Sequence, residues 1–293
     1  MCMSNEEYVT LVNSISNEQV PEVMFATILK IHLELEGTIE SMTEAEVWRY
    51  GLFKSFFKIY NTILRLSEGT SYVFNPKISY IDIKSINTQI RACHELYLLF
   101  QYITTNTIGD GKLDEKEFKY ECYRLAGAID SKRTYEKIKN FVGYQEQCDI
   151  EIEKLRNEIS ECRQIISGSE IYNLLSSNTK NAVRNGHWRV DVEKRLSWND
   201  LLAYTPMSRV YGTLEYHVLS MYAHTSHASL ELEANHDYDM ISALAHLYKL
   251  TALMSFSTLN AFGLNYNSFL EKREVALIYD LMTIENKLIS EQS

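Results

Sequence analysis

Residues that interrupt helices are scarce in this chain, which contains 11 Gly and 3 Pro among its 293 residues. Alternating runs of β-branched residues are also sparse, whereas Leu, Glu, Lys and Tyr recur at the period of an α-helix. With 45% hydrophobic residues, the chain can bury one large core or two adjoining ones. The sequence therefore predicts an all-α protein, a multi-helix bundle in one or two subdomains, and it disfavours a sheet.

The sequence also lacks the short motifs of the common enzyme classes. It has no Gly-x-x-x-x-Gly-Lys or Gly-x-Gly-x-x-Gly phosphate loop, no Gly-x-Ser-x-Gly elbow and no His-Glu-x-x-His helix. The usual nucleotide-binding and hydrolase mechanisms therefore find no support, and we expect no cofactor.

The cysteines form no Cys-x-x-Cys pair, and their number is odd. They are Cys2, Cys93, Cys122, Cys148 and Cys162. Such scattered thiols are typical of a reducing compartment, so we expect no disulfide and no structural zinc. The first residues also lack the basic and apolar runs of a secretory signal, and we expect a cytoplasmic protein.

Basic residues are outnumbered, with 29 Lys and Arg against 39 Asp and Glu, and the formal net charge is −10. This charge disfavours broad nucleic-acid binding but leaves room for a local basic patch. The best candidate patch consists of Lys180, Arg184, His187, Arg189, Lys194 and Arg195. Because Asp191 and Glu193 interrupt it, a solvated surface explains the patch more simply than RNA contact does, although RNA contact stays open.

The segment 250–270 contains no charged residue, which raises the question of a membrane span. It also contains eight Ser, Thr and Asn residues, too many for ready insertion into a bilayer. We expect a core helix followed by a turn, and no membrane partner.

Several helix ends in the chain carry recognisable signals. A helix is predicted after Pro21, with an apolar stripe and a stop at Gly37, and Thr43 with Glu46 predicts a capping box for the next helix. The segment 69–80 reads as a loop around Pro76, after which Ser85 could cap the following helix.

The segment 106–117 resembles half of a calcium-binding EF-hand, because Gly111 and Glu117 fall at the turn and bidentate-ligand positions. Ile108, however, offers no side-chain oxygen at the third position. A helix–loop–helix corner, with Asp114 and Glu117 forming a capping box, explains the same residues more simply.

A very long or once-broken helix is predicted over 131–166, with an apolar stripe and charges opposite. The stripe consists of Cys148, Ile152, Leu155, Ile159 and Cys162. Such a helix could form an antiparallel hairpin or a dimerisation strut. Gly168 ends it, so we divide the chain into an N-terminal helical region, 1–168, and a C-terminal helical bundle, 169–293, in which Ser197 and Asp200 make a further cap.

Histidine and hydroxyl side chains are concentrated in a helix predicted from Pro206 through Glu233. One side of this helix is apolar and comprises Leu214, Val218, Leu219, Met221, Tyr222, Leu230 and Leu232. Within about a third of the circumference, the other side carries Thr213, Tyr216, His217, Ser220, His224, His227 and Glu231. The isolated residues His32, His94 and His246 lie in apolar stretches, and we interpret them as core residues.

Three interpretations compete for the polar side of this helix. A packed ladder from Tyr216 through Ser220 to His224, facing a neighbouring helix, is the simplest. Metal binding by His224, His227 and Glu231 would need a second helix with matching ligands, which the sequence lacks, so we expect no metal. The third is metal-independent RNA cleavage by acid–base chemistry, in which Arg209 would supply the cation.

The pattern of Tyr216, Leu219, Ser220 and His224 resembles the signature of a group of uncharacterised helical bacterial proteins. It is also loosely similar to the HEPN superfamily of toxin–antitoxin and phage-defence systems. The resemblance covers the last third of the chain and implies a bundle whose signature helix faces a partner, often across a dimer. In HEPN ribonucleases an arginine precedes the active histidine by four to six intervening residues. Here no arginine has that spacing before His224.

We therefore expect a helical protein–protein association module of a bacterial stress or phage-defence system. It would either form a homo-oligomer or bind a partner protein. The alternatives are a HEPN-like ribonuclease that uses His224, Ser220, Tyr216 and Arg209, and a His/Glu metal-binding helical protein.

Overall fold

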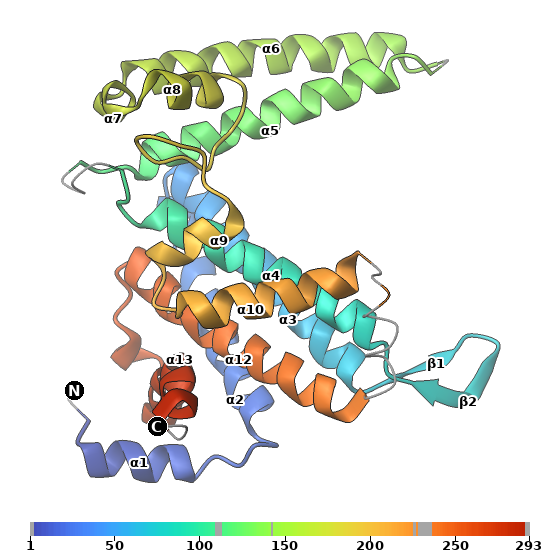
Figure 1. Ribbon diagram of the computed structural model, residues 1–293, viewed down its shortest axis with the longest axis vertical. Helices are drawn as coiled ribbons and strands as arrows, with labels where there is room; N and C mark the ends of the chain where they lie inside the picture. The colour runs from blue at the N-terminus through green and yellow to red at the C-terminus, as the bar shows by residue number, and fades with distance from the viewer. Residues whose placement is uncertain (1–2, 109–112, 142, 225–226, 228–235, 291–293) are drawn as a thin grey trace. The chain divides into compact units, whose positions relative to one another are not determined.

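The computed structural model describes residues 3–108, 113–141, 143–224, 227 and 236–290. The chain forms two compact units (Figure 1). Unit 1 combines Met1–Gln101 with Thr205–Ser293, and unit 2 is Tyr102–Tyr204. Most described residues are helical, which confirms the predicted all-α class.

Unit 1 is built around one central helix. Its helices are α1 (Asn5–Asn13), α2 (Val20–Glu36), η1 (Ile39–Ser41), α3 (Glu44–Ser67), α4 (Ile83–Thr104), α10 (Arg209–Ala223), α12 (His236–Ala261), η3 (Tyr266–Ser268) and α13 (Lys272–Ser290). Helix α12 packs against α2, α3 and α13, and Leu247, Leu250 and Leu253 on it are fully buried. A helix that is apolar on most sides is stable only when other helices surround it. The core helix predicted at the start of the segment 250–270 is therefore confirmed. In the described ranges, no helix is long and apolar enough to cross a membrane.

Two of the helix boundaries predicted for unit 1 are confirmed, and a third differs. Helix α2 ends before Gly37, and α3 begins with the capping box of Thr43 and Glu46, in which each residue accepts a backbone N–H of the other. Helix α4 begins earlier than predicted. Asp82 lies before its first turn and accepts the backbone N–H of Ser85, so Asp82 rather than Ser85 occupies the capping position.

The segment predicted as a loop is a β-hairpin, and the expectation of no sheet is wrong at this point. Strand β1 (Thr70–Tyr72) pairs antiparallel with β2 (Asn75–Tyr80). Gly69, with φ of +92°, turns the chain out of α3 into the hairpin. Tyr72, Ile78 and Tyr80 are residues that favour strands, and the rings of Tyr72 and Tyr80 lie 4.8 Å apart across the pair.

Unit 2 is organised on a helical hairpin. Helices α5 (Lys116–Ile138) and α6 (Gln145–Gly168) run antiparallel and side by side (Figure 1), so the predicted long helix is broken once, between 139 and 144. Gly143, with φ of +91°, lies in this connection. Cys148, Ile152, Ile159 and Cys162 of the predicted stripe are buried.

Short helices complete unit 2 after residue 168. They are α7 (Glu170–Leu174), α8 (Ser177–Arg184), α9 (Trp198–Leu201), capped by Ser197 and Asp200 as predicted, and η2 (Leu202–Tyr204). Ile171, Leu175 and Val183 join the apolar core of α5 and α6. Because the chain turns back onto the hairpin after Gly168, residues on both sides of the predicted division at 168 belong to unit 2.

The corner before α5 is closed by a buried ion pair. Glu115 accepts the backbone N–H groups of Thr107 and Ile108, and its carboxylate lies 2.8 Å from the ammonium of Lys119. Asp114 accepts the backbone N–H of Lys116 at 3.1 Å, next to the first turn of α5. Gly111 lies outside the described residues.

Candidate functional site

The helix that carries the Tyr, Ser and His pattern is shorter than predicted. Helix α10 begins at Arg209, after Ser208, and ends at Ala223. His224 is the C-cap, with its backbone N–H directed to Ser220 O and a non-helical conformation of its own. Ser and Thr, which favour caps and turns over helix interiors, follow it. Of the residues expected further along this helix, Leu230, Glu231 and Leu232 lie outside the described residues.

The two faces of α10 also differ from the prediction. Leu219 and Tyr222 are buried, but Leu214 is 58% exposed and Val210 is 82% exposed, so the apolar side is narrower than expected. On the polar side Thr213, Tyr216 and Ser220 are half-buried, whereas His217, His224 and His227 are exposed.

Tyr216 connects α10 to α4 in unit 1. Its hydroxyl donates to Glu95 Oε1 at 2.8 Å and accepts from Arg91 Nη2 at 3.1 Å. Arg91 and Glu95 are one turn apart on α4 and form an ion pair of 3.2 Å. Burial raises the pKa of the Tyr216 hydroxyl, so this group stays protonated near neutrality.

His224 joins the same cluster through an arginine that the sequence did not indicate. Arg91 Nη1 lies 3.4 Å from His224 Nε2. The predicted ladder of side chains does not form, because the Ser220 hydroxyl donates to the backbone oxygen of Tyr216. Arg209 is 15 residues before His224, which is about 22 Å along a helix, so it does not reach this imidazole.

A buried layer of histidines lies beside Tyr216. The ring of His94, on α4, contacts that of Tyr216 edge-on at 5.6 Å, and His94 Nδ1 lies 3.1 Å from His246 Nε2 on α12. His246 Nδ1 is 3.0 Å from the Tyr211 hydroxyl and 4.0 Å from a Glu215 oxygen, both on α10. The prediction that His94 and His246 are core residues is confirmed, since both are buried.

Burial controls the protonation of this layer. It lowers the pKa of His94 to about 3 and holds the pKa of His246 well below its ordinary value, so both rings are neutral near pH 7. Burial also raises the pKa of the Glu215 carboxyl to about 7. The site therefore combines an exposed imidazole beside a guanidinium with an uncharged histidine pair beneath.

A family model described as a family of unknown function, DUF5677, matches residues 49–240, which is more than half of the chain. The chain belongs to this family. No curated protein and no solved structure matches the chain.

The DUF5677 region contains Arg91, His94, Glu95, Tyr216 and His224, and its end at residue 240 leaves out His246. The matched region therefore includes every side chain of the exposed cluster. Tyr211, His246 and His94 form a chain of hydrogen-bonded groups, and the last nitrogen of this chain, His94 Nε2, is buried without a hydrogen-bond partner.

Metal ligands are not brought together in the part of this DUF5677 chain that the structure describes, where no group of three His, Cys, Asp or Glu side chains could hold an ion. Arg91 and Glu95 were missed by sequence reasoning, although two opposite charges one turn apart on a largely apolar helix are a visible signal.

Proposed function

We propose that the protein is a cytoplasmic association module, acting in a bacterial stress or phage-defence setting, that pairs with a second copy of itself through its β-hairpin. The supporting observation is the exposure of apolar side chains on residues 70–81. Phe74 is fully exposed and Val73 is 87% exposed, at the tip between the strands. Tyr72, Ile78, Tyr80 and Ile81 are also exposed.

A hairpin of this kind is poorly stable by itself. Two strands without a packed face are marginal in water, and both edges of the pair have backbone groups open to pairing. Lys77 is the only charged residue of the segment 70–81, in a chain of net charge −10. A second copy offers the same apolar, charge-poor surface, which suits the self-complementary contact of a two-fold dimer.

Charged substitutions at the hairpin tip should separate the copies. We expect the wild-type protein to be a dimer by sedimentation velocity, and Val73→Asp/Phe74→Asp to raise the dissociation constant at least about a hundredfold, because carboxylates would enter an apolar interface. Val210→Asp, on an exposed position of α10, is the matched control and should stay dimeric. A monomeric wild type at micromolar concentration, or a dimer that survives the double substitution, would contradict the proposal.

A second candidate is metal-independent RNA cleavage at the exposed cluster. It is favoured by the 3.4 Å separation of Arg91 Nη1 and His224 Nε2. An imidazole can take the proton of a ribose 2′-hydroxyl as that oxygen attacks phosphorus, while a guanidinium stabilises the charge on the phosphoryl oxygens. The bond from phosphorus to the 5′-oxygen of the next nucleotide breaks as the 2′,3′-cyclic phosphate forms, and solvent water protonates the departing 5′-oxygen. Arg91 here replaces Arg209 in the HEPN-like hypothesis, and Tyr216 positions Arg91.

This candidate predicts a large loss of activity from one exposed side chain. If the protein cleaves single-stranded RNA in the presence of EDTA, His224→Ala should slow cleavage by about 100-fold or more. His217→Ala removes an exposed histidine from the same helix and should leave the rate unchanged. Absence of cleavage by the wild type, or equal loss in both variants, would rule out this role.

A further inference from the structure

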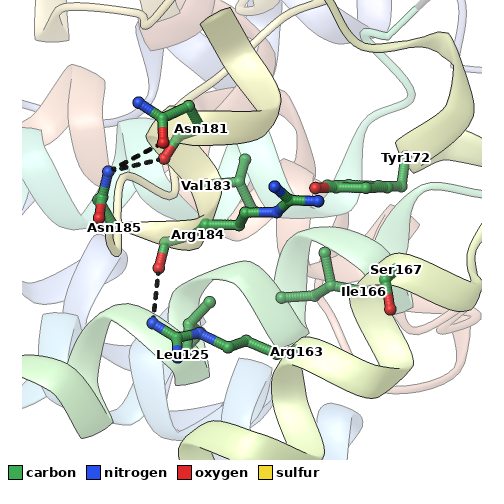
Figure 2. A pocket seen from close by; sticks show the side chains of 9 residues that line it. All are labelled: Leu125, Arg163, Ile166, Ser167, Tyr172, Asn181, Val183, Arg184 and Asn185. Atoms are coloured by element: carbon green, nitrogen blue, oxygen red, sulfur yellow. Dashed lines mark hydrogen bonds between the residues drawn. The ribbon is translucent and has the colours of Figure 1, made fainter. Parts of the chain in front are cut away.

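Unit 2 contains a cavity of about 470 Å³ between α6, α7 and α8, with Leu125 of α5 at its base (Figure 2). This volume lies within the range of small-molecule sites. The polar side chains that line the cavity are Arg163, Ser167, Tyr172, Asn181, Arg184 and Asn185. No carboxylate lines it.

The two arginines of the cavity differ from three other arginines of unit 2. Arg124, Arg133 and Arg156 each pair with a carboxylate within 4.0 Å. Among the described residues, neither Arg163 nor Arg184 has such a partner. Two guanidinium groups that share a cavity without a counter-charge favour an anion there.

Both guanidinium groups are held near the cavity by local contacts. Arg163 Nη2 donates to the backbone oxygen of Arg184 at 3.0 Å, the bond drawn in Figure 2. The Arg184 guanidinium lies over the Tyr172 ring, 5.9 Å from its centroid, and the Lys180 ammonium lies 5.4 Å from the same centroid. Lys180 and Arg184 belong to the basic patch predicted from sequence. Of the other members of this patch, Arg195 contacts His187, and Lys194 pairs with Asp200.

Tyr172 supplies an independent sign of a missing ligand. Its side chain is 7% exposed, and its hydroxyl is buried without a hydrogen-bond partner. Figure 2 shows this hydroxyl directed toward the Arg184 guanidinium. A buried hydroxyl left unpaired costs about 1–3 kcal/mol, and an acceptor oxygen of a ligand would satisfy it.

We propose that this cavity binds a small phosphate monoester with an apolar or aromatic body. The guanidinium forks of Arg163 and Arg184 match the geometry of phosphate oxygens, and the Tyr172 hydroxyl donates a further hydrogen bond. The side chains of Ile166 and Val183 line the same cavity and would contact the body of the ligand. The charge attracts the phosphate, and the volume of about 470 Å³ could accept a ligand of about the size of a mononucleotide.

The proposal is tested by calorimetric titration of the full chain with adenosine monophosphate, and with adenosine as the ligand without phosphate. We expect adenosine monophosphate to bind at millimolar concentration or below and adenosine not to bind. Arg184→Gln should weaken binding about tenfold or more, and Tyr172→Phe should weaken it measurably without changing charge.

Arg156→Gln is the matched control, because Arg156 lines the adjoining groove and pairs with Glu153. The affinity of Arg156→Gln for adenosine monophosphate should equal that of the wild type. Far-UV circular dichroism and thermal unfolding establish that each variant is folded, and Arg163→Gln replaces Arg184→Gln if the latter is not. Absence of binding to the wild type, equal binding of adenosine, or an equal loss in Arg156→Gln would overturn the proposal.

Discussion

Replacing Lys119 with Met should lower the free energy of unfolding of unit 2 by about 3–5 kcal/mol. Lys119 and Glu115 are both fully buried, and the ammonium also donates to Tyr102 O, Thr105 O and Thr107 Oγ1. The substitution leaves the Glu115 carboxylate buried without its counter-charge and removes the donor that these three oxygens share.

The loss is measured by urea unfolding followed through tryptophan fluorescence, because Trp188 and Trp198, two of the three tryptophans, lie in unit 2. Lys154→Met removes an exposed lysine that pairs with Glu151, and it should change stability by less than about 1 kcal/mol. Glu115→Gln/Lys119→Met removes both charges together but keeps a side-chain oxygen that can accept a backbone N–H, and it should recover part of the stability. If Lys119→Met and Lys154→Met lowered the free energy of unfolding equally, the importance of the buried pair would be contradicted.

Glu215→Gln should stabilise the protein at neutral and alkaline pH relative to the wild type, and the advantage should disappear in acid. Burial raises the pKa of Glu215 from 4.5 to about 7, so the folded state retains a proton that the unfolded chain releases between these values. The stability that Glu215 contributes is complete below pH 4.5 and is lost as the pH rises through 7. The difference between variant and wild type should therefore change by about 3 kcal/mol across this window.

Paired urea titrations of the two proteins at a series of pH values test this dependence. His94 and His246 have lowered pKa values, so they reduce stability as the pH falls below 6.5, in the opposite sense to Glu215. Both histidines are present in both proteins, so their contribution cancels in the difference. A difference that stays constant with pH would show that the Glu215 carboxyl is not kept protonated by burial.

The parts of the fold that depend on contacts between residues close in the sequence could be predicted. The caps at Thr43 and Ser197 and the stripe from Cys148 to Cys162 involve residues within a few turns of one another. The hairpin was missed because its strands are short and Pro76 suggested a loop, although Ile78 and Tyr80 alternate as strand residues do.

The candidate site could be predicted only in part, because its contacts join distant parts of the chain. The sequence placed Tyr216 and His224 near one another, but the guanidinium that joins them comes from Arg91 on another helix. His94 and His246 were correctly predicted to be buried, yet their contact spans 152 positions and leaves no trace in local spacing. The phosphate cavity was likewise hidden, since Arg163 lies outside the basic patch that contains Arg184.

The discontinuity of unit 1 has a consequence for synthesis on the ribosome. Helices α2 and α3 emerge first, but α12, which fills the centre of their core, is made only after the whole of unit 2. Unit 2 is a continuous segment and can fold as soon as it has emerged, whereas the apolar faces of α2 and α3 must wait. We therefore expect the nascent chain to need protection from aggregation until α12 has emerged, a period in which chaperones act.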